Sequence, residues 1–256
     1  MNNIILEFDA KAMRRRIWEI VPGFLSWTTL IGLGLLAFTI PYWIAVFVIA
    51  YDVYLLIRIV YMSIHLLYAY RRLNEYKHVD WIQKLETEKA DIAWNKIHHI
   101  TVIPTYDESI HVLKTSISAL AKTDFPHDRL HVVIGFEDRA GDAAKKRASA
   151  LKKEFGKKFG SFLTTFHPDG IAGEKKVKSA NATWAIQRME ESLKKKKIED
   201  KHILVSNFDS DTVVPTEYFS YLTHSFLHAK NRYQASYQPI PVYNNNLWDA
   251  PSFSRV

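Results

Sequence analysis

The chain has 256 residues, of which 48% are hydrophobic and 24% are charged, and its formal net charge is +7. This composition indicates a folded protein and excludes an intrinsically disordered one. Because the chain contains no cysteine, disulfide bonds and thiolate metal sites are excluded as well. The excess of positive charge leaves anionic lipid, nucleic acid and a phosphorylated substrate open as partners.

The N-terminal part of the chain is strongly apolar, and residues 20–51 include no charged side chain. This run is too long for one membrane span, and Pro41 offers a break within it. We therefore predict two spans, over about residues 20–40 and 42–66, in a transmembrane hairpin that takes in residues 1–70. A cleaved signal peptide is not expected, because the second apolar span follows the first directly.

Basic residues flank this hairpin on both sides. Arg14, Arg15 and Arg16 precede the first span, and Arg71 and Arg72 follow the second. Positively charged flanks favour the cytoplasmic side of a membrane. We therefore expect a protein integral to a bacterial-type inner or plasma membrane, with the soluble remainder of the chain in the cytoplasm.

Residues 71–96 form a connector of mixed charge. Its apolar side chains recur at roughly helical spacing: Tyr76, Val79, Trp81, Ile82 and Leu85. An amphipathic helix of this kind could lie on the membrane surface or pack against the domain that follows. The pattern fits both arrangements equally.

From residue 97 to the end, apolar strand-like runs alternate with helical patterns. Strands are predicted at residues 97–103, 130–136, 161–166 and 203–208, with a further strand at 232–238. Helices are predicted at residues 110–120, 142–159, 177–193 and 215–229. This alternation predicts an α/β domain with a mostly parallel sheet, in which ligands bind beyond the carboxyl ends of the strands.

Acidic residues follow three of the predicted strands. The three clusters are Thr105-Tyr106-Asp107-Glu108, Glu137-Asp138 and Asp209-Ser210-Asp211. Each cluster alone also fits a turn or a helix cap. Together they would converge on one sheet edge, where carboxylates repel each other unless a cation is present. Oxygen ligands spaced as in Asp-x-Asp suit Mg²⁺ or Mn²⁺ that carries a phosphorylated substrate.

A basic segment at residues 173–181, which includes Lys175, Lys176 and Lys178, leads into a predicted helix. Lysine side chains and free backbone N–H groups at a helix start bind phosphate, although a solvated helix start fits the pattern too. The other lysine-rich stretches, at residues 145–158 and 194–197, are interpreted as solvated or membrane-facing surfaces.

The order of these segments resembles that of family 2 glycosyltransferases, and more narrowly the membrane-embedded branch that includes cellulose and hyaluronan synthases. The segments that carry the resemblance are Val102-Ile103-Pro104-Thr105-Tyr106-Asp107-Glu108, Phe136-Glu137-Asp138, Lys178-Ser179-Ala180-Asn181 and Asp209-Ser210-Asp211. The resemblance covers residues 97–256. It implies a Rossmann-like GT-A fold, a nucleotide-sugar donor, Mg²⁺ or Mn²⁺, and sugar transfer that inverts the anomeric configuration.

The resemblance also implies where the nucleoside of the donor binds. Thr105 and Tyr106 match the positions that hold the nucleoside, and Glu108 lies beside them in the sequence. Asp138 matches the acid that reads a uracil ring, so a UDP-sugar is the expected donor. Because Glu137 stands where the family more commonly has aspartate, the base preference stays open.

The remaining matches concern the diphosphate and the metal. Lys178 matches the lysine near the donor diphosphate, and Asn181 matches the asparagine that follows it. Asp209 and Asp211 match the acids that bind the metal, and Asp209 also matches a diphosphate-site residue. Gln238 resembles a glutamine near the donor site.

No position of this chain matches the family's catalytic base, which is an acid in a Thr-Glu-Asp or Glu-Asp motif well after the metal site. The Gln-x-x-Arg-Trp motif that usually follows also has no match. We therefore name no catalytic residue and expect the base to lie beyond Val256, in a longer enzyme of which this chain is the donor-binding part.

Two other functions fit parts of the sequence. A membrane-anchored module that binds a nucleotide-sugar without turnover would keep the donor site and lack the base. A membrane-tethered nucleic-acid binder would account for the charge of +7, but base-stacking aromatic residues are not interleaved with the lysines. The expected partners are therefore a nucleotide-sugar, a glycan or lipid-linked acceptor and the lipid bilayer, with no nucleic acid.

Overall fold

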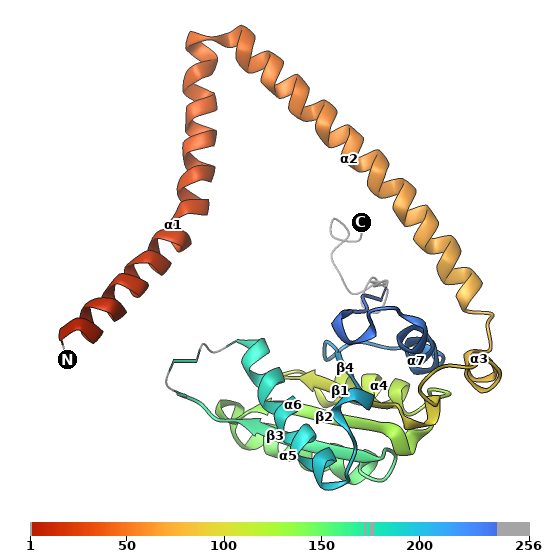
Figure 1. Ribbon diagram of the computed structural model, residues 1–256. Coiled ribbons are helices and arrows are strands. Elements are labelled where there is room, and N and C mark those ends of the chain that lie inside the picture. Colours follow the sequence, from red (N-terminus) through yellow and green to blue (C-terminus); the bar gives the residue numbers. More distant parts are fainter. Residues whose placement is uncertain (1, 172, 175–176, 240–256) are drawn as a thin grey trace. The chain divides into compact units, whose positions relative to one another are not determined.

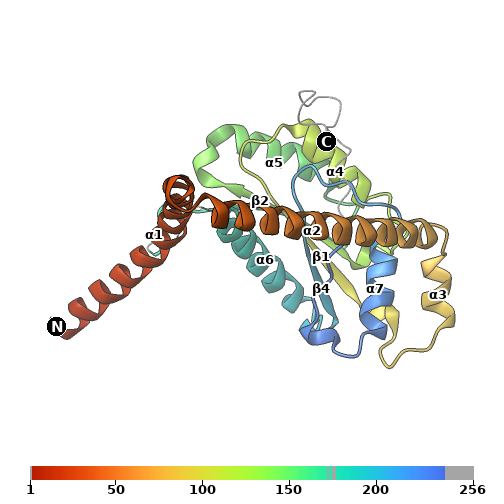
Figure 2. The ribbon, with the colours of Figure 1, turned by 90° about the horizontal axis from the view of Figure 1, so that it is seen from above.

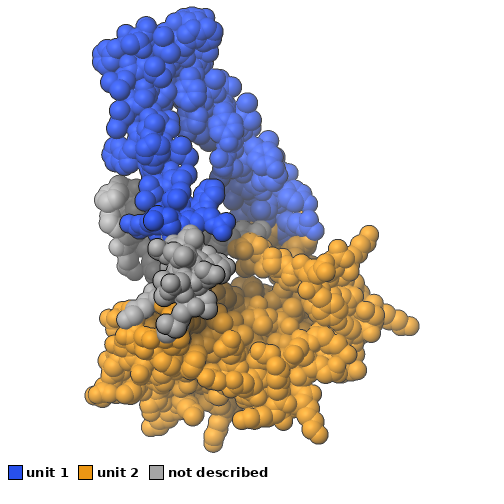
Figure 3. Space-filling model, turned by 60° about the vertical axis from the view of Figure 1, so that its left-hand side comes forward, with its two compact units in different colours: residues 1–72 blue, residues 73–256 orange. Residues whose placement is uncertain are grey.

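A computed structural model describes residues 2–171, 173–174 and 177–239. The chain divides into two compact units, residues 1–72 and 73–256 (Figure 3). The first unit contains α1 (Asn2–Thr39) and most of α2 (Pro41–Tyr76), and the second contains all the strands (Figure 1).

The first unit consists of two long apolar helices. α1 ends at Thr39 and α2 begins at Pro41, so Ile40 alone joins them. The predicted break at Pro41 is confirmed, and Pro41 occupies the first position of α2, where proline is favoured because its missing N–H has no partner there. By length and composition, Met13–Thr39 and Pro41–Tyr76 could each cross a membrane and together form a transmembrane hairpin.

Both helices extend beyond the spans predicted at residues 20–40 and 42–66. The apolar run sets the predicted span, but charged residues continue the helix beyond it. In α1, Glu19 pairs with Arg15 at 3.5 Å and with Arg16 at 3.2 Å, one turn away. Such pairs support a helix whose side chains are polar.

The second unit is built on four parallel strands in the order β3-β2-β1-β4. The strands are β1 (His98–Pro104), β2 (Leu130–Glu137), β3 (Ser161–His167) and β4 (Ile203–Asn207). Each agrees with a predicted strand to within one residue at either end. The predicted α/β class with a parallel sheet is therefore confirmed.

The fifth strand, predicted at residues 232–238, is wrong. Arg232–Gln234 form a single 3-10 turn, η5, and residues 235–239 have no regular structure. Arg232 is held by Asp91, with 2.7 Å between its Nη1 and the carboxylate, and it lies over the ring of Phe226. These contacts hold the segment around Arg232 in a position where it does not pair with β4. Within residues 2–171, 173–174 and 177–239, the outer edge of β4 has no strand beside it.

Helices cover both faces of the sheet (Figure 2). The helices of the domain are α3 (Trp81–Thr87), α4 (Ile110–Leu120), α5 (Gly141–Phe155), α6 (Lys178–Lys195) and α7 (Tyr218–His228). Short 3-10 turns lie at Trp94–Lys96 (η1), His127–Arg129 (η2), Asp138–Ala140 (η3) and Asp200–His202 (η4). Three helix predictions shift by several residues: α5 ends earlier than predicted, α6 runs on by two residues, and α7 begins after the turn headed by Pro215.

The two faces follow from alternation along β2. Leu130, Val132, Ile134 and Phe136 join a core cluster with the buried side chains of α4 and α5. Val133 points the other way and packs with Ala182, Ala185, Met189 and Leu193 of α6. Because successive side chains of a strand face opposite sides, one strand serves two cores. The central strands β1 and β2 are therefore buried on both faces, and ligands are left to the ends of the strands.

The connector belongs with the domain in its packing. Asp80 caps α3, whose Trp81 and Leu85 are buried. The ring of Trp81 lies 4.6 Å from that of Tyr221 and 5.0 Å from that of His224, both on α7. Of the two arrangements that the sequence left open for this helix, the structure has the one packed against the domain.

Candidate functional site

Three predicted site segments leave the same edge of the sheet. β1 lies between β2 and β4, and all three run in the same direction. The residues that follow their carboxyl ends therefore come together as predicted: Thr105 after β1, Asp138 after β2 and Asp209 after β4. The functional roles of these residues stay predictions.

Glu108 joins the end of β1 to the segment after β4. The Thr105 hydroxyl donates to its Oε2 at 2.6 Å, and the backbone N–H of Tyr106 donates to the same oxygen at 2.7 Å. From the other segment, the hydroxyl of Ser210 donates to Oε1 at 3.1 Å. Ser210 is fixed in turn, since its carbonyl accepts from the buried hydroxyl of Ser116 at 2.7 Å. The Asp-x-Asp segment is thus tied to the loop after β1 by its middle residue.

The environment of Glu108 favours its ionised form. Partial burial alone would raise the pKa of this carboxyl group, but hydrogen bonds from Thr105, Tyr106 and Ser210 together lower it below the ordinary value. Glu108 is therefore a carboxylate with most of its hydrogen-bonding capacity directed at the protein. In this structure Glu108 holds the loop after β1 and the segment after β4 in place.

Asn181 ties α6 to the ends of two strands. Its Nδ2 donates to the carbonyl of Gly135 at 2.8 Å and to that of Thr105 at 3.4 Å, and the residue is only 2% exposed. A Cβ at Gly135 would lie 2.5 Å from the Asn181 Oδ1, which is closer than real Cβ contacts. Glycine at this position of β2 is what allows the amide to reach the strand.

Lys178, the first residue of α6, pairs with Asp209 through its ammonium group. The side chains remain 51% and 72% exposed. Exposed ion pairs contribute little to stability, so this one can exchange its partners for a ligand at low cost. The contact also brings the first lysine of the helix to the Asp-x-Asp segment from 31 positions away in the sequence. Lys175 and Lys176 of the same basic segment lie outside the described residues.

An aromatic and cationic surface adjoins these groups. The ring of Tyr106 is 48% exposed, and the guanidinium of Arg139 lies 4.7 Å from its centre. Arg147 fixes the same loop, because it donates to the Tyr106 carbonyl at 3.2 Å and pairs with Asp107 at 3.3 Å. Asp138 is exposed at the start of η3, directly after β2. The ring of Tyr106 and the guanidinium of Arg139 are thus in contact, and Asp138 directly precedes Arg139 in the chain.

The donor set at the end of β4 fits a hard divalent cation. Asp211 is exposed, like Asp209 two residues before it. Within the described residues, the cluster of three metal-ligating side chains lies elsewhere in the domain. At the end of β4, Asp209 and Asp211 would therefore be the two protein ligands of a metal ion. Mg²⁺ is usually bound by one or two carboxylates, with water and substrate phosphates completing its octahedral shell. Two carboxylates therefore suffice.

His167, at the end of β3, was not among the predicted site residues, and it joins Glu137 to a second acid. Glu137 is 6% exposed, and its Oε2 lies 3.6 Å from the Nδ1 of His167 and 3.5 Å from the Nε of Arg139. The other ring nitrogen of His167 lies 3.1 Å from the carboxylate of Glu174. Glu137, His167 and Glu174 line a cavity of about 20 Å³, enough for one water molecule. The available signal was a histidine at the carboxyl end of a third parallel strand.

Gln238 lies apart from the predicted donor-site residues described above. It is exposed and lines a hollow of about 560 Å³ along the outer edge of β4, together with residues of α7 and of the segment around η5. The contacts described above for Glu108, Asn181 and Asp209 do not include it. Residues 240–256 of the predicted domain lie outside the described residues.

Comparisons with known proteins find similarity only among solved structures, and that similarity is weak. No protein-family model matches the chain, and no curated protein matches it. Among solved structures, a crystal structure of S. aureus TarS residues 1–349 is 18% identical, with a TM-score of 0.36; the match covers 51% of this chain and 32% of that one. A crystal structure of S. aureus TarS is 16% identical, with a TM-score of 0.34 and coverage of 51% and 19%. The chain thus matches a third or less of those proteins, and a likeness this slight does not argue for a shared activity.

Proposed function

We propose that this chain is the donor-binding part of a membrane-bound, metal-dependent glycosyltransferase of the family 2 type, most similar to its cellulose- and hyaluronan-synthase branch. It would bind a UDP-sugar and pass the sugar to a polysaccharide or lipid-linked acceptor with inversion. The observation that carries the proposal is the Lys178–Asp209 contact, which joins two family-like segments at the carboxyl edge of the sheet. The α/β fold and the two apolar helices are consistent with it.

Each group of residues has a part in donor binding. Thr105 and Tyr106 hold the nucleoside, and the exposed Asp138 accepts a hydrogen bond from the uracil N–H. The ring of Tyr106 offers a surface for the base. Glu108 keeps these residues in place through the hydrogen bonds of the loop after β1. Gln238 is assigned to the periphery of the donor site on the resemblance alone.

Asp209 and Asp211 would hold Mg²⁺ or Mn²⁺, which, when bound, neutralises charge that develops on the diphosphate leaving group. Lys178 adds a second positive charge at the same place, and it exchanges the Asp209 carboxylate for a phosphate oxygen when the donor enters. The amide of Asn181 fixes the first turn of α6, so that the lysine stays at the mouth of the site. The proton of the attacking hydroxyl requires a base, and no residue of this chain is assigned to that role.

In this proposal the enzyme is a membrane protein, which is supported by two helices long and apolar enough to cross a membrane. The arginines before the apolar part of α1 and near the end of α2 favour the cytoplasm for both ends, so the donor-binding domain would be cytoplasmic and would meet cytoplasmic nucleotide-sugars. Protease accessibility in inside-out membrane vesicles tests the orientation: the domain should be cleaved in these vesicles and protected in right-side-out ones.

The test of donor binding is calorimetric titration of the full chain in detergent with UDP, with and without Mn²⁺. Binding should require Mn²⁺, and Asp211→Ala should abolish it or weaken it more than about tenfold, since even outer-shell partners of a metal are worth ~10–100-fold. Asp142→Asn is the matched control, because this acid is 88% exposed on α5 and has no assigned role.

The outcomes separate the parts of the proposal. Equal affinity for UDP in Asp211→Ala and the unchanged chain would contradict the metal assignment. No binding of UDP or of other nucleoside diphosphates to the unchanged chain would contradict the donor site as a whole. Binding without release of UDP on addition of acceptors, in the longest natural form of the protein, would favour a module that binds a nucleotide-sugar without turnover.

A further inference from the structure

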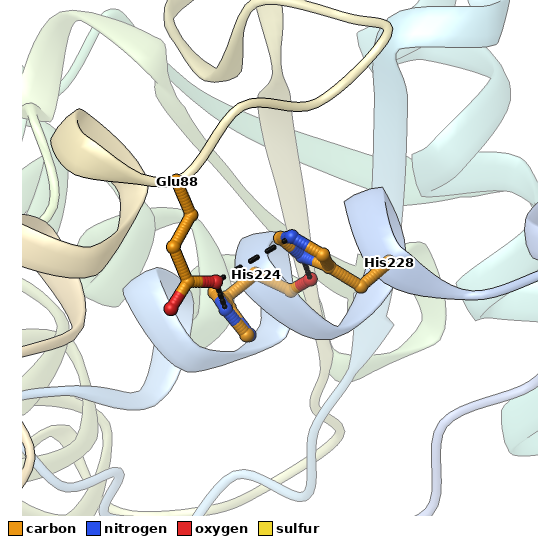
Figure 4. Close-up of side chains that lie close together, drawn as sticks. All are labelled: Glu88, His224 and His228. Carbon is orange, nitrogen blue, oxygen red and sulfur yellow. Dashed lines mark hydrogen bonds and ion pairs between the residues drawn. The ribbon is translucent and has the colours of Figure 1, made fainter.

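A cluster of one glutamate and two histidines lies outside the donor site. Glu88 follows α3 at its C-terminal cap, and His224 and His228 lie on α7 (Figure 4). A ligand atom from each of the three side chains lies within 4.8 Å of the others. The carboxylate and both imidazoles face one another across the two helices, as Figure 4 shows.

The two histidines are one helical turn apart, so they share a face of α7. Their rings stack with centroids 4.2 Å apart. The Nε2 of His224 lies 2.8 Å from the Glu88 Oε2, and the Nε2 of His228 lies 3.5 Å from the same oxygen. In a tetrahedral Zn²⁺ site, with bonds of about 2.0–2.2 Å, neighbouring ligand atoms are about 3.3–3.5 Å apart. The observed separations need only small side-chain rotations to reach that spacing.

The hydrogen bond of His228 to the backbone involves Nδ1, so Nε2 is the nitrogen that can bind a metal. Its Nδ1 lies 2.9 Å from the carbonyl oxygen of His224, which can only accept, so in the neutral ring Nδ1 carries the proton. The lone pair is then on Nε2, the nitrogen directed at Glu88. Metal-ligating histidines commonly have their other nitrogen held by a backbone carbonyl in this way, which fixes the tautomer and the ring orientation.

We propose that Glu88, His224 and His228 form a binding site for a divalent transition-metal ion, with Zn²⁺ the foremost candidate. Imidazole nitrogens select Zn²⁺ and its neighbours over Mg²⁺ and Ca²⁺, which prefer oxygen ligands alone. Three protein ligands leave a fourth position to water. Solvent reaches the site, since the side chains of Glu88 and His228 are 40% and 39% exposed.

The bound ion would fasten the connector to the domain. Without it, α3 is held to α7 by apolar packing around Trp81 and by the hydrogen bond between Glu88 and His224. A metal would add a bridge of three coordinate bonds at the point where α3 ends. It stabilises the folded arrangement because the unfolded chain does not bring these three residues together.

The experiment uses the full chain in detergent, purified without a histidine tag and treated with a chelator. Zn²⁺ should bind at one site per chain by calorimetry and raise the melting temperature. Co²⁺ should produce the visible absorption of a nitrogen- and oxygen-ligated site. His228→Ala and Glu88→Gln should each weaken Zn²⁺ binding more than about tenfold, whereas removal of the exposed His111 on α4, in His111→Ala, should not change it.

Two further measurements keep this site distinct from the donor site. Asp211→Ala should retain the Zn²⁺ site, and millimolar Mg²⁺ should not displace Zn²⁺ from it. Absence of Zn²⁺ binding to the unchanged chain at micromolar concentrations would overturn the proposal. So would affinity that is the same in His228→Ala, Glu88→Gln and the unchanged chain, because the ion would then be bound elsewhere.

Discussion

The two edges of the sheet carry ionisable residues in opposite surroundings. At the amino edge, where the strands begin, His99 and His131 are buried, at 0% and 1% exposure. At the carboxyl edge, Asp138, Asp209 and Asp211 are exposed to solvent. β1 and β2 thus begin among uncharged histidines in the core, and the segments after β1, β2 and β4 carry charged groups in water.

The buried histidines are held neutral. Burial, together with the neighbouring histidines, lowers the pKa of His99 to about 3. Burial, followed by the influence of His98 and Lys196, lowers the pKa of His131 to about 4. The hydrogen-bond partners of these rings come from neighbouring elements: Thr223 lies 2.8 Å from His99, and the ring nitrogens of His98 and His131 are 3.0 Å apart. Such groups serve stability and are unsuited to binding a ligand.

The difference between the two edges indicates which of them can bind an ionic ligand. Charges that stay in water cost little to keep and are available to an ionic ligand, whereas the amino edge has its ionisable groups committed to the core. In this sheet the edge expected from parallel topology to bind ligands is also the one with exposed acids and lysine.

The largest expected effect is acid destabilisation through the amino edge. Below pH 6.5 the unfolded chain protonates its histidines, while His99 and His131 stay neutral in the fold until about pH 3 and 4. Stability is therefore full above pH 6.5 and falls as the pH drops. Two such histidines cost about 4 kcal/mol between pH 7.5 and 5. Unfolding free energy measured across this range checks the value.

His131→Gln isolates one member of the pair. The slope of stability against pH between 6.5 and 5 should decrease by about one proton, or ~1.4 kcal/mol per pH unit. His111→Gln, which changes an exposed histidine of α4, should leave the slope as it is. A slope that is equal in His131→Gln and the unchanged chain would mean that this histidine is protonated in the fold, and that the amino edge is not a neutral one.

A smaller effect is expected from the contact between Gly135 and Asn181. Gly135→Ala places a methyl group 2.5 Å from the Asn181 Oδ1 and 3.2 Å from the Cβ of Ala185. Overpacking of this kind costs about 1–3 kcal/mol of unfolding free energy. If the amide is the obstacle, the added cost of Gly135→Ala should be smaller in an Asn181→Ala background, by about 1 kcal/mol. Strict additivity of the two changes would place the strain elsewhere.

Much of this fold is readable from the sequence, for a physical reason. Buried parallel strands such as Leu130–Glu137 are continuous apolar runs, and the helix between Ile110 and Leu120 shows the period of a one-sided core. Local patterns of this kind depend on which face is buried, which the sequence encodes directly. The strand predicted at residues 232–238 failed because the ion pair of Arg232 with Asp91, 141 positions away, is not local.

The candidate sites divide in the same way. The edge that gathers Thr105, Asp138 and Asp209 could be predicted, since parallel topology decides which loops meet. The hydrogen bonds of Glu108 with Ser210 could not, because 102 positions separate the two residues. Likewise, 136 positions separate Glu88 from His224, although the i,i+4 spacing of His224 and His228 on a predicted helix was a usable signal.

The smallest effect on stability is expected at the carboxyl edge, from Lys178→Ala. The pair that it forms with Asp209 is largely exposed, so its loss should change the unfolding free energy by less than about 0.5 kcal/mol. Binding of UDP with Mn²⁺ should nevertheless weaken by about tenfold, because a hydrogen bond to a charged group is worth ~1.5–3 kcal/mol. Thermal unfolding and calorimetry of the same preparations measure the two quantities.

Lys194→Ala is the matched control, since this lysine lies on the same helix, is similarly exposed and pairs with Glu190 at 2.7 Å. Both variants should be as stable as the unchanged chain, and only Lys178→Ala should lose affinity. Equal affinities would make the Lys178–Asp209 contact an ordinary surface ion pair and would remove the main support for a donor site. A loss confined to Lys178→Ala would mean that the carboxyl edge uses its exposed charges for binding, in contrast to the amino edge, where the buried histidines are neutral.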